Sequence, residues 1–305
     1  MIRRPPRSTQ SRSSAASDVY KRQILGIALS TAASASSDSE RAISVFLLCG
    51  IVAYGIQWVG FIAAWLKHTE HFFDLLGSIT YVAVISIALL LSNNLGTRSV
   101  ILAIIVITWA LRLGSFLVLR VKREGSDSRF NAMKHKFAWF LFTWTVQGLW
   151  VLVTASAALA AITSKDDKNF GLIGFLGLSV WVLGFSVEVI SDEAKRKFRS
   201  QEENKDRFIS SGLWAISRHP NYLGEILLWT GVAIIAIPAL SGWSFATLVS
   251  PLFVWLLLTK ISGIPMLEKK ADRRWKNDLE YERYKASTPV LFPFRKKLNS
   301  RPADL

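Results

Sequence analysis

Four ionisable side chains lie within apolar runs of this sequence, where a charge is costly and is usually kept for a function. They are Asp74, Arg112, Glu188 and Glu225. A carboxylate in such a place can accept hydrogen bonds or face a cation, and an arginine there needs an anion, a carbonyl or water. A structural ion pair within a helical bundle is the alternative for each residue. These four positions are the first candidates for a buried polar site.

The most distinctive motif is the run SRHPNYLGE at residues 217–225. Pro220 suits the first turn of a helix, because the N–H that it lacks would have no helical partner there. Asn221 and Glu225 are four residues apart and therefore share one face of that helix. Gly224 lets another backbone or a flat ring approach closely. The run predicts a polar site at the mouth of a helix; a plain helix start with a snorkelling arginine is the alternative.

A second set of residues forms one helical stripe. Glu188, Asp192, Arg196 and Arg199 are spaced by four, four and three residues, which places them on one face. The basic members, together with Arg207, have the chemistry to clamp phosphates, because arginine binds them through two parallel hydrogen bonds. A solvated helix attracted to anionic lipids is the alternative.

Seven apolar runs must position these groups. Each is about 20 residues long, enough for a helix to cross a hydrocarbon core of about 30 Å. Because 51% of the 305 residues are hydrophobic and only 19% are charged, most soluble enzymes and DNA-binding proteins are excluded. We predict an all-α integral membrane bundle of seven transmembrane helices. The predicted spans are Ala42–Leu66, Phe72–Leu91, Ser99–Leu119, Phe137–Ile162, Phe170–Ile190, Tyr222–Leu240 and Ser244–Gly263.

The net charge of +15 is concentrated in the polar segments between and after the spans. Lys and Arg outnumber Asp and Glu by 6 to 2 in residues 120–136, by 7 to 5 in 191–221 and by 11 to 6 from residue 268 onward. The positive-inside rule places these segments in the cytoplasm. Seven spans then put the N-terminus outside and the C-terminus in the cytoplasm. Nucleic acid is not an expected partner.

Composition divides the chain into three parts. Residues 1–23 resemble translated sequencing-adapter sequence, with a true basic tail or the charged region of a signal peptide as the alternative. The predicted parts are a non-native or disordered segment at 1–41, a seven-helix membrane domain at 42–294 (substrate side mainly 42–119, cofactor side mainly 109–294) and a basic tail at 295–305.

Metal-binding residues are scarce. Cys49 is the single cysteine and there are four histidines, so a disulfide within the chain or a Cys-ligated metal is excluded. His68 and His71 flank Glu70, but we expect no metal site there. No P-loop and no dinucleotide-binding glycine fingerprint is present.

The SRHPNYLGE run, Ser-Asp at 191–192 with the basic stripe after it, and the tail Glu282-Arg-Tyr284…Pro293-Phe294 resemble the membrane steroid 5α-reductases and their bacterial DUF1295 relatives. The resemblance extends over roughly residues 42–294 and is strongest in 185–294. It implies a seven-helix reductase that uses NADPH to reduce a carbon–carbon double bond conjugated to a ketone. The C4–C5 bond of a 3-oxo-Δ4 steroid is the family's example.

By this resemblance, Asn221 and Glu225 are expected near the nicotinamide, and Asp192 is expected to hold the cofactor. Two departures are visible: eukaryotic relatives carry Asn where this chain has Glu188, and residues 266–270 replace a His-rich segment. Arg112 matches the family's arginine on span three. Basic positions near the adenosine phosphates are matched by Arg196, Arg199 and Arg207. The full set expected to bind NADPH also includes Glu188, Asp192, Asn221, Tyr222, Glu225, Trp229, Glu268 and Tyr284.

On the substrate side, the family uses an acid or amide together with a tyrosine to polarise the ketone. Gln57, Asp74 and Tyr81 are the candidates here, and the last two share a helical face because they are seven residues apart. In such a reaction hydride goes to the β carbon, and a hydrogen-bond donor aimed at the ketone oxygen lowers the barrier. The expected partners are a lipophilic steroid-like substrate and membrane lipids, with the protein a monomer in a bacterial inner membrane.

Two other classes of protein stay open. The Arg-His-Pro-x-Tyr-x-Gly part of the motif also resembles membrane methyltransferases of the isoprenylcysteine or phospholipid type, which use S-adenosylmethionine. Those enzymes carry a Glu-Glu pair near the last helix, where this chain has Glu268-Lys269-Lys270. A seven-helix receptor or transporter is the other class, although no paired broken helices are visible in two halves of the chain.

Overall fold

The computed structural model describes residues 40–93, 95–124, 130–165 and 169–292. All regular structure in these ranges is helical, and seven helical segments are long and apolar enough to cross a membrane. The prediction of an all-α bundle with seven transmembrane helices is therefore confirmed, and the protein is a multi-pass integral membrane protein. Most of the predicted N-terminal segment and all of the predicted basic tail lie outside the described residues.

The chain forms two compact units, which are described one at a time. Within the described residues, the first unit takes in the chain up to Phe175 and the stretch Val232–Ser250. The second unit comprises Leu176–Gly231 and the chain from Pro251 onward.

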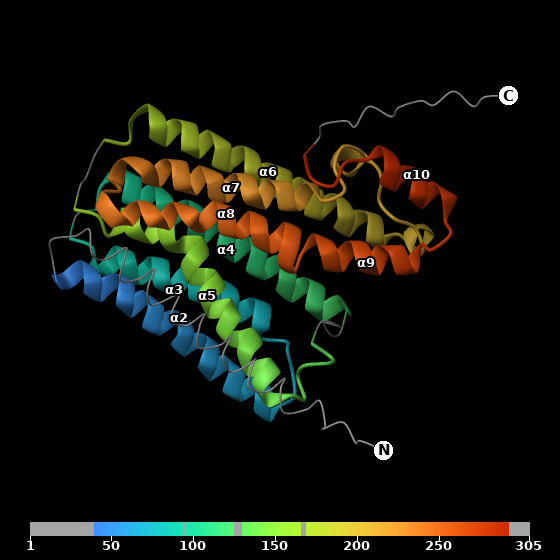
Figure 1. The fold of residues 1–305 in the computed structure, drawn as a ribbon, viewed down its shortest axis with the longest axis horizontal. Helices are drawn as coiled ribbons and strands as arrows, with labels where there is room; N and C mark the ends of the chain where they lie inside the picture. Colours follow the sequence, from blue (N-terminus) through green and yellow to red (C-terminus); the bar gives the residue numbers. More distant parts are fainter. Residues whose placement is uncertain (1–39, 94, 125–129, 166–168, 293–305) are drawn as a thin grey trace, which may run out of the picture. The chain divides into compact units, whose positions relative to one another are not determined.

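The first unit is built on four long helices: α2 (Glu40–Leu66), α3 (Phe73–Leu91), α4 (Thr97–Glu124) and α5 (Phe137–Ile162). In Figure 1, α2, α3 and α5 run close together, and α3 packs against α2, α4 and α5. Every residue of α5 from position 151 to 162 is buried. This run is rich in alanine, which lets neighbouring helices approach α5 closely.

A buried arginine ties together separate segments of the first unit. Arg98, at the start of α4, donates from Nη1 to the carbonyl of Ile235 at 2.6 Å and from Nη2 to the carbonyl of Asn169 at 2.8 Å. Ile235 lies in the last turn of α7 (Pro220–Ala236), where carbonyls have no partner within the helix. The positive charge of Arg98 also suits the negative end of the helix dipole.

The second unit contains most of α6 (Gly171–Ser200) and of α7, followed by the end of α8 (Val249–Leu256), the π-helical turn η5 (Leu257–Ile261), α9 (Ile264–Arg274) and α10 (Leu279–Ser287). Helices α6 and α7 lie side by side (Figure 1) and touch backbone to backbone. A Cβ added to Gly224 would lie 2.6 Å from the carbonyl oxygen of Gly184 and from the amide nitrogen of Glu188. One added to Gly231 would lie 2.6 Å from the carbonyl oxygen of Gly177. The close approach that the sequence predicted for Gly224 is confirmed.

Two spans differ most from their predicted bounds. Helix α6 continues ten residues past Ile190, because its polar extension makes its own helix-stabilising pairs: Glu193 contacts Arg196 and Lys197, one turn further on. The segment predicted as a single helix over Ser244–Gly263 is divided. It consists of the 3₁₀ turn η4 (Gly242–Leu248), α8 and the π-helical turn η5, and a new helix, α9, comes next with Pro265 in its first turn.

The α6–α7 contact predicts a steric effect at Gly184. The methyl group of Gly184→Ala would lie 2.5 Å from the amide nitrogen of Leu228, so the helices must separate. We expect a loss of about 1–3 kcal/mol in the free energy of unfolding, measured by thermal unfolding in detergent. Gly55→Ala is the control, because a Cβ there meets nothing within 4 Å. Equal melting temperatures for the two variants would contradict the close contact.

Candidate functional site

The predicted polar site lies at the start of α7 in the second unit. Pro220 is the first residue of the helix, as the sequence predicted. His219 precedes it and stacks on Tyr222, with ring centroids 5.7 Å apart and an interplanar angle of 12°. The backbone N–H of Arg218 donates to the carbonyl of Pro289 at 2.9 Å, so the segment just after residue 287 contacts the beginning of this helix.

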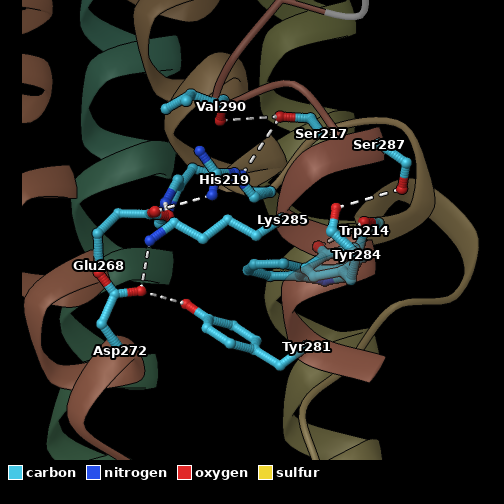
Figure 2. A network of polar contacts seen from close by, with 11 residues as sticks. Trp214, Ser217, His219, Glu268, Asp272, Tyr281, Tyr284, Lys285, Ser287 and Val290 are labelled. Carbon is cyan, nitrogen blue, oxygen red and sulfur yellow. Dashed lines mark hydrogen bonds and ion pairs between the residues drawn. The ribbon is translucent and has the colours of Figure 1, made fainter. Parts of the chain in front are cut away.

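Glu268 of α9 joins the two residues that precede α7. One carboxylate oxygen lies 2.8 Å from His219 Nε2, and the other lies 2.9 Å from Arg218 Nη1. Figure 2 shows this contact with His219 at the centre of a larger polar network. The side chains of Arg218 and His219 are only 11% and 7% exposed. The carboxylate therefore neutralises a cation that is largely withheld from water, and α9 is held against the start of α7.

The surroundings of His219 favour its neutral form. Burial lowers the pKa of His219 below its usual range, the bond to Glu268 partly opposes this, and the nearby charges of Lys195 and Arg218 lower the pKa further. A neutral ring that donates from Nε2 to Glu268 carries a lone pair on Nδ1. Nδ1 is buried and makes no hydrogen bond within the described part of the chain. It can therefore accept a hydrogen bond from a ligand.

The two sequence patterns meet where α6 faces α7. Asn221 Nδ2 donates to Asp192 Oδ1 at 3.2 Å, and Asp192 is 7% exposed. Glu188 is buried one turn earlier on α6, beside the close approach at Gly224. Of the other residues predicted on α7, Glu225 is half-buried and Trp229 is buried.

The basic stripe of α6 is only partly available to a ligand. Arg196 donates to both carboxylate oxygens of Glu193, one turn earlier, so its fork is already occupied. Arg199 and Arg207 are exposed. Arg207 lines a surface depression of about 250 Å³ together with Phe208 and others. These two arginines are the exposed members of the predicted basic set.

A second basic surface was not predicted from the sequence. A depression of about 510 Å³ on α9 is lined by Met266 and four basic residues. The signal was present in the spacing, because positions three and four apart share a helical face. The basic residues are Lys269, Lys270, Arg273 and Arg274.

The C-terminal helix α10 is fastened through tyrosine hydroxyls. Tyr284 donates to the carbonyl of Trp214 at 2.7 Å, and Trp214 Nε1 in turn donates to the carbonyl of Ser191 at 3.1 Å. Tyr281 donates to Asp272 at 3.0 Å (Figure 2). Burial raises the pKa of Tyr284 to about 12, so its hydroxyl stays a donor at neutral pH. Tyr284 and Glu268 were expected to bind the cofactor. In the structure Tyr284 holds α10 against Trp214, and Glu268 holds α9 against the start of α7. Their contacts with the cofactor stay predictions.

The substrate-side candidates all lie in the first unit, where each joins α3 to a neighbouring helix. Gln57 of α2 is fully buried and donates from Nε2 to Thr80 at 2.8 Å. Asp74 pairs with Arg120 of α4 at 3.4 Å. The buried ring of Tyr81 packs edge-on against Trp109 of α4, with centroids 5.1 Å apart.

Arg112 also lies in the first unit, on α4. Its guanidinium lies over the ring of Phe116, 5.3 Å from the centroid. Among the described residues, no group of three or more His, Cys, Asp or Glu is arranged to hold a metal ion.

Comparisons with known proteins identify the family of the chain. The chain belongs to the family described as protein of unknown function (DUF1295), whose model matches residues 58–288. The resemblance to the steroid 5α-reductases is confirmed by similarity to 3-oxo-5-alpha-steroid 4-dehydrogenase 1 of Rattus norvegicus, which is 27% identical over 118 residues. The corresponding protein of Bos taurus is 25% identical over the same length.

These matches are partial. The rat and bovine matches cover 39% of this chain, and the chain spans about two fifths of the length of each relative. The chain is also 23% identical over 159 residues to the Probable O-methyltransferase ustE of Ustilaginoidea virens, which is 46% of this chain and 54% of that protein. No solved structure matches the chain significantly.

The neutral state of His219 predicts a dependence of stability on pH. Because folding lowers the pKa of His219, the unfolded chain takes up the proton first, and stability is lost as the pH falls below about 6.5. His219→Gln retains an N–H donor for Glu268 and does not titrate. We expect its melting temperature in detergent to decline less on acidification than that of the unaltered protein.

His135→Gln is the matched control for this experiment, because His135 is exposed and lies in the first unit. It should keep the pH dependence of the unaltered protein. An identical decline in melting temperature for His219→Gln and the unaltered protein would show that His219 is not protonated on unfolding.

Proposed function

We propose that the protein is an NADPH-dependent membrane reductase that reduces a carbon–carbon double bond conjugated to a ketone in a lipophilic substrate, such as the C4–C5 bond of a 3-oxo-Δ4 steroid. The observation that carries this proposal is the polar site at the start of α7, where Asn221 bonds to Asp192 across the glycine contact of α6 and α7. The relatives named 3-oxo-5-alpha-steroid 4-dehydrogenase 1 support it.

The residues of the second unit fit a nicotinamide cofactor. The buried Nδ1 of His219 is an acceptor without a partner among the described residues, and a carboxamide N–H is a suitable donor for it. Asn221 retains a carbonyl oxygen, and Glu225 shares its helical face. We assign binding of the nicotinamide to this group. When bound, NADPH supplies the hydride.

We assign binding of the cofactor's phosphates to the exposed basic residues. The side chains of Arg199 and Arg207 are exposed to solvent. Exposed arginines suit a cofactor with a pyrophosphate and a 2′-phosphate better than S-adenosylmethionine, which has no phosphate. The other residues proposed for the cofactor are Arg112, Glu188, Tyr222, Trp229, Glu268 and Tyr284.

Polarisation of the substrate ketone is assigned to the first unit. Asp74 pairs with Arg120 and, as a carboxylate, accepts hydrogen bonds. The Nε2 group of Gln57 is turned toward Thr80. Tyr81 can donate from its hydroxyl without a change of protonation state, so it is the proposed donor to the ketone oxygen, with Gln57 and Asp74 as supporting residues.

The proposed setting is a bacterial inner membrane, with the N-terminus outside and the C-terminus in the cytoplasm. The excess of Lys and Arg in residues 120–136 and after residue 268 supports this orientation. The lipophilic substrate then enters from the bilayer, and the charged cofactor enters from the cytoplasm. A monomer suffices for this scheme.

A methyltransferase that uses S-adenosylmethionine is the second candidate. Similarity to the Probable O-methyltransferase ustE favours it, as does the Arg-His-Pro-x-Tyr-x-Gly pattern at residues 218–224. Against it, Glu268 is followed by two lysines, where the methyltransferases have a second glutamate.

The test is oxidation of NADPH by the detergent-purified protein given testosterone or progesterone. We expect a product heavier by two hydrogens. Asn221→Ala removes the hydrogen bond to Asp192 and should lower turnover at least about tenfold. Asn131→Ala, at an exposed asparagine of the first unit, is the matched control and should leave turnover unchanged.

Each other result has a definite meaning. Tight NADPH binding without turnover of either steroid would retain the cofactor and exclude these two substrates. Binding of S-adenosylmethionine in place of NADPH would overturn the reductase and support the methyltransferase.

A further inference from the structure

Glycines in the first unit make room for polar side chains where α2, α3 and α5 meet. A Cβ added to Gly148 of α5 would lie 2.9 Å from the ring of Tyr54 and 3.6 Å from Cγ of Gln57. A Cβ added to Gly77 of α3 would clash with the amide of Gln147. A Cβ added to Gly60 of α2 would lie 2.7 Å from the indole ring of Trp144. Four side chains at these gaps form what we call the polar layer: Tyr54, Gln57, Trp144 and Gln147.

Hydrogen bonding fixes the orientation of the Gln57 amide. The hydroxyl of Thr80 donates to the carbonyl of Leu76 at 2.6 Å. Its oxygen is therefore left to accept, and Gln57 must turn its NH₂ group toward it, at 2.8 Å. This leaves Oε1 of Gln57 as a buried acceptor, with no hydrogen-bond partner among the described residues.

The same argument applies to Gln147 of α5. Its Nε2 donates to the carbonyl of Phe73 at 2.9 Å, and a carbonyl can only accept. Oε1 of Gln147 is thus a second buried acceptor that finds no partner in the described residues. Gln57 Nε2 also lies 3.4 Å from the carbonyl oxygen of Leu76. Phe73 and Leu76 are three residues apart on α3, so the two glutamines meet one face of that helix about a turn apart.

The other two members of the polar layer contribute donors. The hydroxyl of Tyr54 and the indole Nε1 of Trp144 are both buried, and neither makes a hydrogen bond within the described part of the chain. A buried polar atom without a partner costs about 1–3 kcal/mol, and a membrane bundle offers no water from its lipid side. A polar group of a bound ligand would supply hydrogen-bond partners for these buried donors and acceptors.

The chemistry of the layer selects the ligand. A ketone oxygen can only accept, so it would leave both glutamine oxygens unsatisfied. A hydroxyl donates and accepts at once, and can give its proton to Gln57 or Gln147 while it accepts from Tyr54 or Trp144. We propose that the polar layer binds a hydroxyl end group of the lipophilic substrate. The inference rests on the proposed function in one respect, because it takes the ligand to be the substrate of that reaction.

The experiment compares two ligands that differ in one oxygen. Testosterone and androstenedione share a 3-oxo-Δ4 skeleton and carry a hydroxyl and a ketone, respectively, at carbon 17. Equilibrium binding of each radiolabelled steroid to the detergent-purified protein is measured without NADPH. We expect the hydroxysteroid to bind about 5- to 10-fold more tightly, the value of one buried hydrogen bond.

Variants separate the acceptors of the layer from its donors. Gln147→Met removes an acceptor that has no proposed part at the ketone, so it should weaken testosterone binding and leave androstenedione binding unchanged. Gln57 is also proposed to support the ketone donor, so Gln57→Met should weaken the binding of both steroids. Tyr54→Phe removes a hydroxyl that bonds to nothing in the described residues, so folding should be unaffected while both steroids bind more weakly. Thr145→Val is the control, because Thr145 bonds to Trp58 outside the layer.

Melting temperature and gel filtration establish that each variant is folded. Equal affinity for the two steroids, binding of neither, or a hydroxyl preference that survives Gln147→Met would overturn the proposal; in the last case an ordered water satisfies the layer. Turnover of NADPH without any hydroxyl preference would retain the proposed function and remove this inference alone.

Discussion

The second unit depends on one constraint, the backbone contact of α6 with α7. Gly184 and Gly224 let the two helices approach until a single methyl group would clash. At that distance a side chain as short as Asn221 can reach Asp192, and the indole of Trp214 can reach the carbonyl of Ser191. The polar groups at the mouth of α7 therefore owe their position to two residues that have no side chain.

In the proposed function, the polar groups give each unit a separate task. In the second unit, Glu268 neutralises Arg218, and His219 stays neutral and able to accept a hydrogen bond. This suits recognition of a polar cofactor. In the first unit, Gln57 and Gln147 use their donors on α3 and retain their acceptors. This suits recognition of one polar group on an otherwise apolar ligand.

The fold was predictable to the extent that it follows from length and local chemistry. Apolar runs of about 20 residues identify the spans, and the start of α7 follows from Pro220. The pairing of His219 with Glu268 was not predictable, because 49 residues separate them and only the packing of α9 brings them together. The amide orientation of Gln57 depends on a hydroxyl of α3, and no sequence pattern reveals which partner an amide chooses.

The π-helical turn at Leu257–Ile261 follows α8, and Ser262 and Gly263 separate it from α9, which begins as a new helix at Ile264. A Cβ added to Gly263 would lie 2.5 Å from the carbonyl oxygen of Leu258 and 2.9 Å from the ring of Tyr222. A side chain at this junction would therefore push the start of α9 away from Tyr222 and draw Glu268 away from His219, although neither member of that pair had been altered. The junction between an apolar span and a charged helix thus has room for a hydrogen atom and nothing larger.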